Sequence, residues 1–123
     1  MNAIPQSGFA EWIRWLFRRR RLVRVTGRSM LPLLQPGDLL FVDVHAYQEE
    51  CPQVGELVVA FHPQQPTLKI IKRISGILVD NRYVLSSDNP LEGTDSRTFG
   101  PLPLTSIVGK VTGRAIKVEA MNR

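Results

Sequence analysis

The stretch Val25-Thr26-Gly27-Arg28-Ser29-Met30-Leu31-Pro32 presents a serine in a setting that suits a nucleophile. Ser29 stands between a glycine and a proline, and Gly37-Asp38 follows a few residues later. Glycine and proline interrupt regular structure and mark turns. A serine hydroxyl becomes an effective nucleophile when a neighbouring group takes its proton. Ser29 is therefore a candidate nucleophile that requires a base from another part of the chain.

Lys72 is the candidate base, because residues 69–74 have the composition of a strand. Side chains alternate between the two faces of a strand. Lys72 then shares its face with apolar residues, namely Leu68, Ile70 and Ile74. Lys69 and Arg73 lie on the other face and are expected to reach water. Burial lowers the pKa of an amine from its usual value of about 10.4, so Lys72 is predicted to act as a neutral general base.

The sequence has few of the cysteine and histidine residues that other nucleophilic sites and metal sites require. Cys51 is the only cysteine, which excludes an internal disulfide and a Cys-based zinc site. His45 and His62 are the only histidines. His62 lies in His-Pro-Gln-Gln-Pro, a predicted hairpin tip, and we expect both histidines to be surface or turn residues. A Ser-His-Asp triad is therefore not expected, and neither is a metal or cofactor.

The net charge of +5 is concentrated at the N-terminus. Residues 1–28 carry seven arginines against Glu11, a net charge of +6, whereas the remaining residues carry nine basic and ten acidic side chains, a net charge of −1. A nucleic-acid-binding domain would spread its basic residues over a folded face. This distribution argues against a nucleic-acid partner.

Residues 9–17 are predicted to form a short amphipathic helix that leads into an arginine run. Its apolar face would consist of Phe9, Trp12, Ile13, Leu16 and Phe17. Residues 9–21 would either lie on an anionic membrane surface or cover an apolar patch of this domain or of a second copy. No run of about 18 apolar residues is present, and no apolar segment of an export signal follows the basic residues. We expect the protein to stay in the cytoplasm, with peripheral membrane contact as the alternative.

After Leu22 the pattern changes to short strands separated by turns. The predicted strands are Leu22–Val25, Leu39–Val44, Glu56–Phe61, Thr67–Ile74, Gly76–Asp80, Arg82–Leu85, Ile107–Val111 and Arg114–Val118. Two hairpins are expected, one joining the third and fourth of these strands and one turning at residues 80–81. Short strands at this spacing favour a mainly β, barrel-like domain over residues 22–123, preceded by the helical segment 1–21.

A long loop, residues 86–105, interrupts this series of strands. Loops of this length are rare in compact domains unless they have a function or are held by internal contacts. Its polar residues Asp88, Asn89, Asp95, Ser96 and Arg97 can bond the backbone and one another. We expect an ion pair between Asp95 and Arg97, and a loop that supports the site from behind.

Taken in order, four segments resemble the type I signal peptidase family of Ser–Lys proteases. They are Gly27 to Pro32, Gly37-Asp38, Lys72-Arg73, and the segment from Asp88-Asn89 through Asp95-Ser96-Arg97 to Ile107-Val108-Gly109-Lys110. Within this group the chain is similar to the maturation proteases of nickel-type superoxide dismutase, which are short and lack a transmembrane anchor. That resemblance implies a serine endopeptidase that removes an N-terminal leader from a precursor protein, here the precursor of nickel superoxide dismutase.

The resemblance also implies roles for individual positions. Ser29 would be the nucleophile and Lys72 the general base, with no cofactor. Backbone N–H groups of Gly27, Arg28 and Ser29 would form the oxyanion hole, and Met30 and Pro32 would shape the substrate pocket. Family members often have a hydroxyl residue where Gly27 stands. They also often have a lysine-steadying serine where Gly93 stands, so Thr94 or a water would have to replace it.

Three alternatives remain open at this point. A membrane-associated type I signal peptidase would cleave signal peptides and use residues 9–21 as a surface anchor. A LexA-like self-cleaving domain also pairs a Gly-x-Ser-Met motif with a strand lysine, although residues 1–22 are too short for a DNA-binding domain. A non-catalytic β module would bind an extended peptide at a strand edge.

Overall fold

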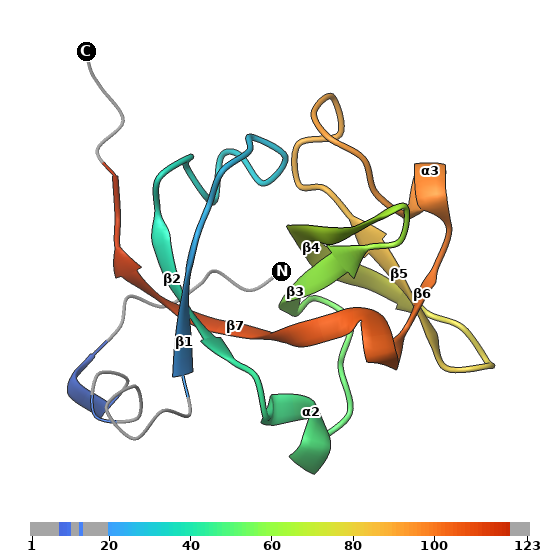
Figure 1. Ribbon diagram of the computed structural model, residues 1–123, viewed down its shortest axis with the longest axis horizontal. Helices are drawn as coiled ribbons and strands as arrows, with labels where there is room; N and C mark the ends of the chain where they lie inside the picture. Colours follow the sequence, from blue (N-terminus) through green and yellow to red (C-terminus); the bar gives the residue numbers. More distant parts are fainter. Residues whose placement is uncertain (1–7, 11–12, 14–19, 119–123) are drawn as a thin grey trace.

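A computed structural model describes residues 8–10, 13 and 20–118 of the chain, and the strands of this part form one antiparallel sheet (Figure 1). The strands are β1 (Arg20–Arg24), β2 (Leu39–Asp43), β3 (Leu57–His62), β4 (Gln65–Ile77), β5 (Arg82–Ser86), β6 (Leu102–Pro103) and β7 (Ile107–Ile116). Their order across the sheet is β1-β2-β7-β3-β4-β5-β6. The predicted mainly β class is confirmed, and the sheet is open, with β1 and β6 at its two edges.

Helical structure is confined to short segments in the part of the chain that the structure describes. From residue 20 onward, these are α2 (Ala46–Glu49), α3 (Ser96–Phe99) and the 3-10 helix η1 (Leu104–Ser106). Of the predicted helix 9–17, Phe9, Ala10 and Ile13 are helical, and the other residues lie outside the described part. Among the described residues, no helix has the length and apolar character needed to cross a membrane.

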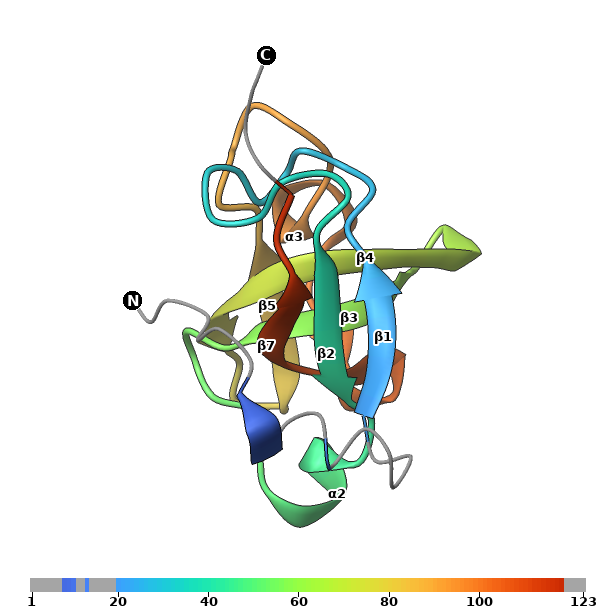
Figure 2. The ribbon, with the colours of Figure 1, turned by 90° about the vertical axis from the view of Figure 1, so that its left-hand side faces the viewer.

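The sheet turns around β7, which changes partner along its length. The first residues of β7 pair with β3 up to Lys110, and the residues from Lys110 to Ile116 pair with β2. As a result β1 and β2 run across the direction of β3 and β4, as Figures 1 and 2 show together. This crossing brings the end of β1, which leads into the Ser29 segment, next to the middle of β4, which carries Lys72.

The apolar core lies on both faces of β3. Leu57 and Val59 belong to one buried cluster with Met30 and residues of β2 and β7. Val58 and Ala60 belong to a second cluster with residues of β4, β5 and β6. Successive strand residues point to opposite faces, so a strand buried on both faces has no polar alternation. The sequence of β3 is therefore a continuous apolar run, and the strand packs against both buried clusters.

The observed strands differ from the prediction at several boundaries. Gly76 is not the start of a new strand, because β4 continues to Ile77 past a bulge near Ser75. Gly113 does not separate two strands either, since it pairs with Phe41 within a continuous β7. Arg20 and residue 21 belong to β1 rather than to the predicted N-terminal helical segment. Glycine weakens a strand in isolation, but here pairing of Gly76 with Val84 of β5 and of Gly113 with Phe41 of β2 overrides that preference.

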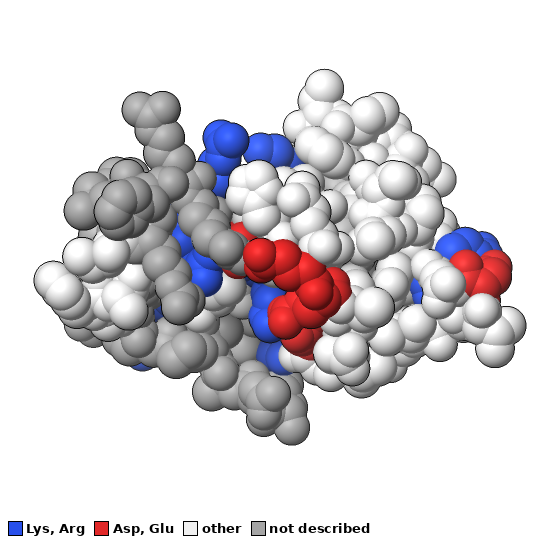
Figure 3. Space-filling view, turned by 90° about the horizontal axis from the view of Figure 1, so that it is seen from below, with Lys and Arg blue, Asp and Glu red and all other residues white. Residues whose placement is uncertain are grey.

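Acidic side chains gather near α2 on the face seen from below (Figure 3). Lys110 lies 3.2 Å from the Glu50 carboxylate and 3.0 Å from that of Glu56. The Tyr47 hydroxyl donates to Glu56 at 2.7 Å, and burial together with this bond raises the pKa of Tyr47. Among the described residues of this face, the Lys110 ammonium is therefore paired with two carboxylates.

Gly109 is expected to be a sensitive position, because it lies where β7 changes partner. A Cβ atom built on Gly109 would lie 2.7 Å from the Asp43 carbonyl oxygen and 2.8 Å from the Val42 side chain. Gly109→Ala should lower the free energy of unfolding by about 1–3 kcal/mol through overpacking, measured by denaturant titration. Gly76→Ala is the matched control, since its Cβ meets only Val84 at 3.6 Å. Equal free energies of unfolding for Gly109→Ala and Gly76→Ala would show that a Cβ atom at Gly109 does not overpack the sheet.

Candidate active site

The Ser29 segment is a loop whose two ends are fastened to each other. The Val25 N–H donates to the Asp38 carbonyl at 2.8 Å, and the Gly37 N–H donates to the Val25 carbonyl at 2.7 Å. The fully buried Asp38 carboxylate accepts the N–H groups of Gln35 at 2.9 Å and Val118 at 2.7 Å. Gly37 has φ +96°, a conformation that favours glycine. The predicted Gly37-Asp38 turn therefore exists, and it closes the base of the nucleophile loop.

The start of the long loop holds the same segment from the other side. The Asn89 N–H donates to the Ser29 carbonyl at 2.7 Å, and the Asn89 side-chain amide donates to the Arg28 carbonyl at 3.2 Å. The Asp88 N–H points to the Met30 sulfur at 3.3 Å. In the described part of the chain, the N–H groups of residues 27–29 make no hydrogen bond, so they are free to bind an oxyanion.

Lys72 is buried in the middle of β4, with 3% of its surface exposed. Its ammonium donates to the Ser87 hydroxyl at 3.0 Å. Burial lowers the pKa of Lys72; the nearby Asp95 carboxylate opposes this effect, and the Arg97 guanidinium adds to it. The predicted desolvated lysine is thus present, and its amine is held by a neutral oxygen rather than by a carboxylate.

Gly93 lies beside both the candidate nucleophile and the candidate base. A Cβ atom built on Gly93 would lie 3.1 Å from the Ser29 Cβ, 3.8 Å from the Ser29 Oγ and 3.3 Å from the Lys72 Nζ. Ser29 and Lys72 therefore meet around the backbone of one residue, which has φ +72°. No hydrogen bond joins the two side chains directly. Such bonds between catalytic groups often tighten only when substrate is bound.

Ser29 and Lys72 open into one cleft of about 570 Å³. Its walls are the end of β1 with the residues leading to Met30, the first half of β4, and the segment from Glu92 to Thr94. Met30 lines the cleft, as predicted. Pro32 is exposed and does not line it, because the chain has already turned away after Met30. The expectation that Pro32 shapes the pocket is therefore wrong.

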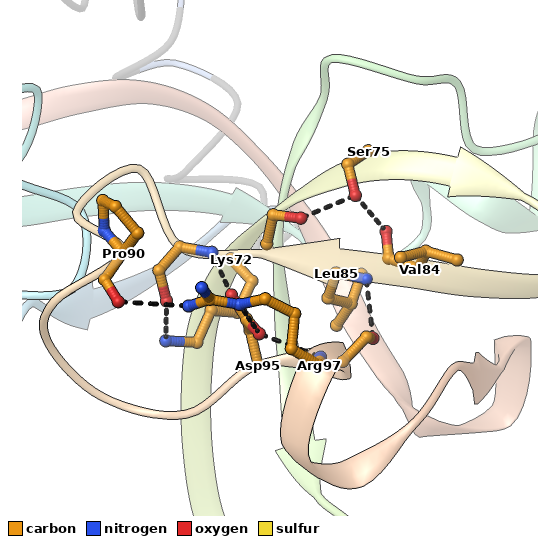
Figure 4. Close-up of polar contacts among 10 residues, drawn as sticks. Lys72, Ser75, Val84, Leu85, Pro90, Asp95 and Arg97 are labelled. Carbon is orange, nitrogen blue, oxygen red and sulfur yellow. Dashed lines mark hydrogen bonds and ion pairs between the residues drawn. The ribbon is translucent and has the colours of Figure 1, made fainter.

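Asp95 anchors the second half of the long loop. Its carboxylate accepts the Arg97 N–H and Nε at 3.0 Å each, and the Ser87 N–H at 3.0 Å. Burial alone would raise the pKa of Asp95, but the bonds from Arg97 and Ser87 lower it. Ser96 accepts the Leu85 N–H at 2.8 Å. The expected ion pair of Asp95 with Arg97 is confirmed, and Figure 4 shows these residues beside Lys72.

Arg73 does not reach water, contrary to the expectation from strand alternation. It is 8% exposed and binds both carboxylate oxygens of Asp88 at 2.9 Å, and it also donates to the Gly55 carbonyl at 2.7 Å. The long loop folds over this face of β4 and covers the guanidinium. The Arg73–Asp88 pair thereby fixes the loop to the strand that carries Lys72.

The sequence reasoning missed two residues that the fold brings to the site. Ser87, rather than Thr94 or a water, holds the Lys72 amine. His62 adjoins the predicted hairpin turn, here residues 63–64, but it is not on the surface, because it is 6% exposed and lines the cleft. His45 is exposed in a turn, as expected. Neither Ser87 nor His62 belongs to a sequence motif that would have indicated its position, since both contacts depend on how the loop folds back.

Ser87→Ala is expected to lower kcat about tenfold, because the Lys72 amine would lose the hydroxyl that orients it. Misplacement of a reacting group by about 1 Å can cost up to about 10²-fold in rate. The matched control is Ser86→Ala, since the Ser86 hydroxyl contacts only Ser75 on the exposed side of β5. The measurement is kcat on a cleavable peptide for the two variants. Equal rates would show that Ser87 does not orient the amine.

Comparisons with known proteins identify the class of protein to which this site belongs. Residues 15–112 match the family described as Peptidase S24-like. Mitochondrial inner membrane protease subunit 1 of Homo sapiens is 30% identical over 109 residues, covering 73% of this chain and 66% of that protein. Subunit 1 from Schizosaccharomyces pombe is 31% identical over 108 residues, covering 72% and 69%. Subunit 2 from Danio rerio is 36% identical over 121 residues, covering 81% and 64%.

The chain thus spans about two thirds of the length of these relatives. Their names support a peptidase, and they favour the signal-peptidase-like alternative over maturation of nickel superoxide dismutase, to which they give no support. The match over residues 15–112 contains the Ser29 loop, Lys72 and the whole long loop. The protein is therefore a member of the Peptidase S24-like family.

Proposed function

We propose that the protein is a signal-peptidase-like serine endopeptidase that removes N-terminal segments from precursor proteins, with Ser29 and Lys72 as its catalytic pair. The observation that carries this proposal is a buried lysine of lowered pKa that meets a serine around Gly93 within an open cleft. The relatives, which are named as inner membrane proteases, support a substrate that is presented at a membrane surface.

The geometry supports a two-step reaction. The Ser29 Oγ attacks the substrate carbonyl carbon while the neutral Lys72 amine takes the hydroxyl proton. The negative charge that forms on the carbonyl oxygen is received by the N–H groups of residues 27–29. Lys72 then returns its proton to the departing amine, which leaves an acyl group on Ser29. Water, deprotonated by Lys72, releases that acyl group and restores the serine.

Substrate binding is proposed to use the strand edges that border the cleft. Among the described strands, β1 pairs with β2 on one side only, so its other edge is proposed to offer backbone N–H and C=O groups to an extended peptide. Val23 and Val25 from this side and Ile70 from β4 line the cleft with apolar surface. Such a cleft suits the extended, weakly polar residues that precede a cleavage site.

The test is cleavage of a panel of precursors, with product masses measured for wild-type protein and Ser29→Ala. One arm carries signal-peptide-bearing precursors with lipid vesicles, one carries the precursor of nickel superoxide dismutase, and one contains the protein alone. Cleavage in the first arm supports this proposal. Cleavage of the nickel superoxide dismutase precursor alone would make that precursor the substrate. Self-cleavage of the protein incubated alone would indicate a LexA-like activity. Binding of a peptide without cleavage would leave a non-catalytic β module.

The pH dependence should follow the protonation of Lys72. The protonated amine cannot accept the Ser29 proton, so kcat/KM is expected to rise as pH increases through the pKa of Lys72. Because burial lowers that pKa, the rise should be complete below the range of an ordinary lysine, which titrates near about 10.4. The measurement is a kcat/KM profile on a peptide without ionisable groups. A flat profile between about pH 6 and 10 would contradict the role of Lys72 as base.

A further inference from the structure

His62 is a buried polar residue that lines the cleft containing Ser29 and Lys72. The residue is 6% exposed at the end of β3, and its ring packs edge-on against Phe99, with ring centroids 5.2 Å apart at 67°. Packing therefore fixes the orientation of a polar ring at the wall of the site.

The hydrogen bonds of His62 determine which nitrogen carries the proton in its neutral form. The Gln64 N–H donates to Nδ1 at 3.1 Å, so Nδ1 supplies a lone pair. A neutral imidazole with an acceptor at Nδ1 carries its proton at Nε2. Nε2 lies 3.3 Å from the Thr94 hydroxyl oxygen. His62 therefore donates to Thr94, and this bond reaches the long loop from the β3 side.

Thr94 directly follows Gly93, which lies beside both the nucleophile and the base. A Cβ built on Gly93 would lie 3.1 Å from the Ser29 Cβ and 3.3 Å from the Lys72 Nζ, so a glycine fits here where a side chain would crowd the pair. A small displacement of Gly93 would change how Ser29 faces Lys72 and would admit water to the amine. On the other side of Thr94, Asp95 is held by Ser87 and Arg97.

We propose that His62 is a positioning residue for the Ser–Lys pair, acting through the Thr94 hydroxyl to hold Gly93 against Ser29 and Lys72. This inference rests on the proposed peptidase function and adds a residue from β3 to its machinery. His62 does not touch the reacting atoms. Its contribution is to keep the loop closed over the amine, so that Lys72 stays desolvated and aimed at the serine.

Four single variants separate the two nitrogens of His62 and test the hydroxyl of Thr94. His62→Gln retains a donor near the position of Nε2, whereas His62→Asn retains only a group near Nδ1. Thr94→Val removes the hydroxyl with little change of shape, and Thr94→Ser retains it. We expect His62→Asn and Thr94→Val to lower kcat about tenfold with KM within about twofold of wild type. His62→Gln and Thr94→Ser should stay within about threefold of the wild-type kcat. The double variant, His62→Asn with Thr94→Val, should be no slower than either single variant.

A second measurement does not depend on activity. The chain has four lysines, at positions 69, 72, 110 and 117, so the side-chain nitrogen of Lys72 can be followed by NMR and assigned with Lys72→Arg. Loss of the His62–Thr94 bond should admit water and raise the pKa of Lys72 toward its ordinary value. Thr94 is exposed, so Thr94→Val is expected to fold even if His62→Asn does not.

The possible outcomes distinguish this inference from the proposed function. An unchanged Lys72 pKa and an unchanged kcat in Thr94→Val would overturn the role of His62, as would independent, additive losses in the double variant. If wild-type protein cleaves no precursor or peptide, the proposed function fails, and the Lys72 pKa in Thr94→Val alone decides whether His62 positions the amine.

Discussion

Ser29→Ala is expected to abolish precursor cleavage, with a loss of roughly 10⁴- to 10⁶-fold in kcat. The variant removes the oxygen that would attack the substrate carbonyl carbon. Ser29 is only partly buried and its hydroxyl makes no hydrogen bond there, so the fold should not change. The measurement is the rate of product formation by mass spectrometry at saturating substrate.

Lys72→Arg is the companion variant and should be equally inactive. Arginine keeps the positive charge and the hydrogen-bonding capacity, but it is not deprotonated in proteins. Lys72→Met keeps the length without the amine and should fold at least as stably, because burial disfavours the charged form of Lys72. Cleavage by Lys72→Arg at more than about one hundredth of the wild-type rate would remove Lys72 as the general base.

Asp88→Asn is expected to give the second large effect, this time on stability. Arg73 and Asp88 form a two-pronged ion pair with both bonds at 2.9 Å, and their side chains are only 10% and 14% exposed. Removing one partner of a buried pair leaves the other charge without compensation and typically costs about 3–5 kcal/mol. The free energy of unfolding of a native protein is usually about 5–15 kcal/mol, so this loss would be a large share of it. The measurement is denaturant-induced unfolding at neutral pH.

Asp80→Asn provides the matched control, because Asp80 pairs with Arg82 at 2.7 Å but the two side chains are 53% and 48% exposed. Exposed pairs contribute about 0–1 kcal/mol, so this variant should unfold close to wild type. A double variant, Arg73→Met with Asp88→Leu, should recover much of the stability, since apolar residues can replace a buried pair. If Asp88→Asn and Asp80→Asn lowered the free energy of unfolding by the same amount, burial would not explain the contribution of the Arg73–Asp88 pair to stability.

Local sequence information predicted the parts of this protein that depend on neighbouring residues. The alternation around Lys72 predicted a strand with this lysine on an apolar face, and it is 3% exposed in β4. The Gly37-Asp38 turn and the Asp95–Arg97 pair were also predicted, since each involves residues close in the chain. The mainly β class followed from the spacing of apolar runs and turn residues.

Contacts between distant segments could not be predicted in the same way. Alternation placed Arg73 in water, but the long loop folds back and buries it against Asp88. The proline-rich context correctly placed His62 at the β3–β4 hairpin turn, but it could not predict that Phe99 packs against the ring and that the residue is buried. Ser87 was overlooked because its hydroxyl meets Lys72 only after β5 pairs with β4.

The sequence by itself determined which atoms are available for chemistry: one serine in a turn, one lysine in an apolar row, and no second thiol. Only the tertiary structure decided how these atoms meet, because the fold brings Gly93 of the long loop beside both Ser29 and Lys72. The two residues after Gly93 are held by His62 from β3 and by Ser87, which directly follows β5. Side-chain type and strand period are local properties, whereas the closeness of two side chains 43 positions apart depends on how the whole sheet bends around β7.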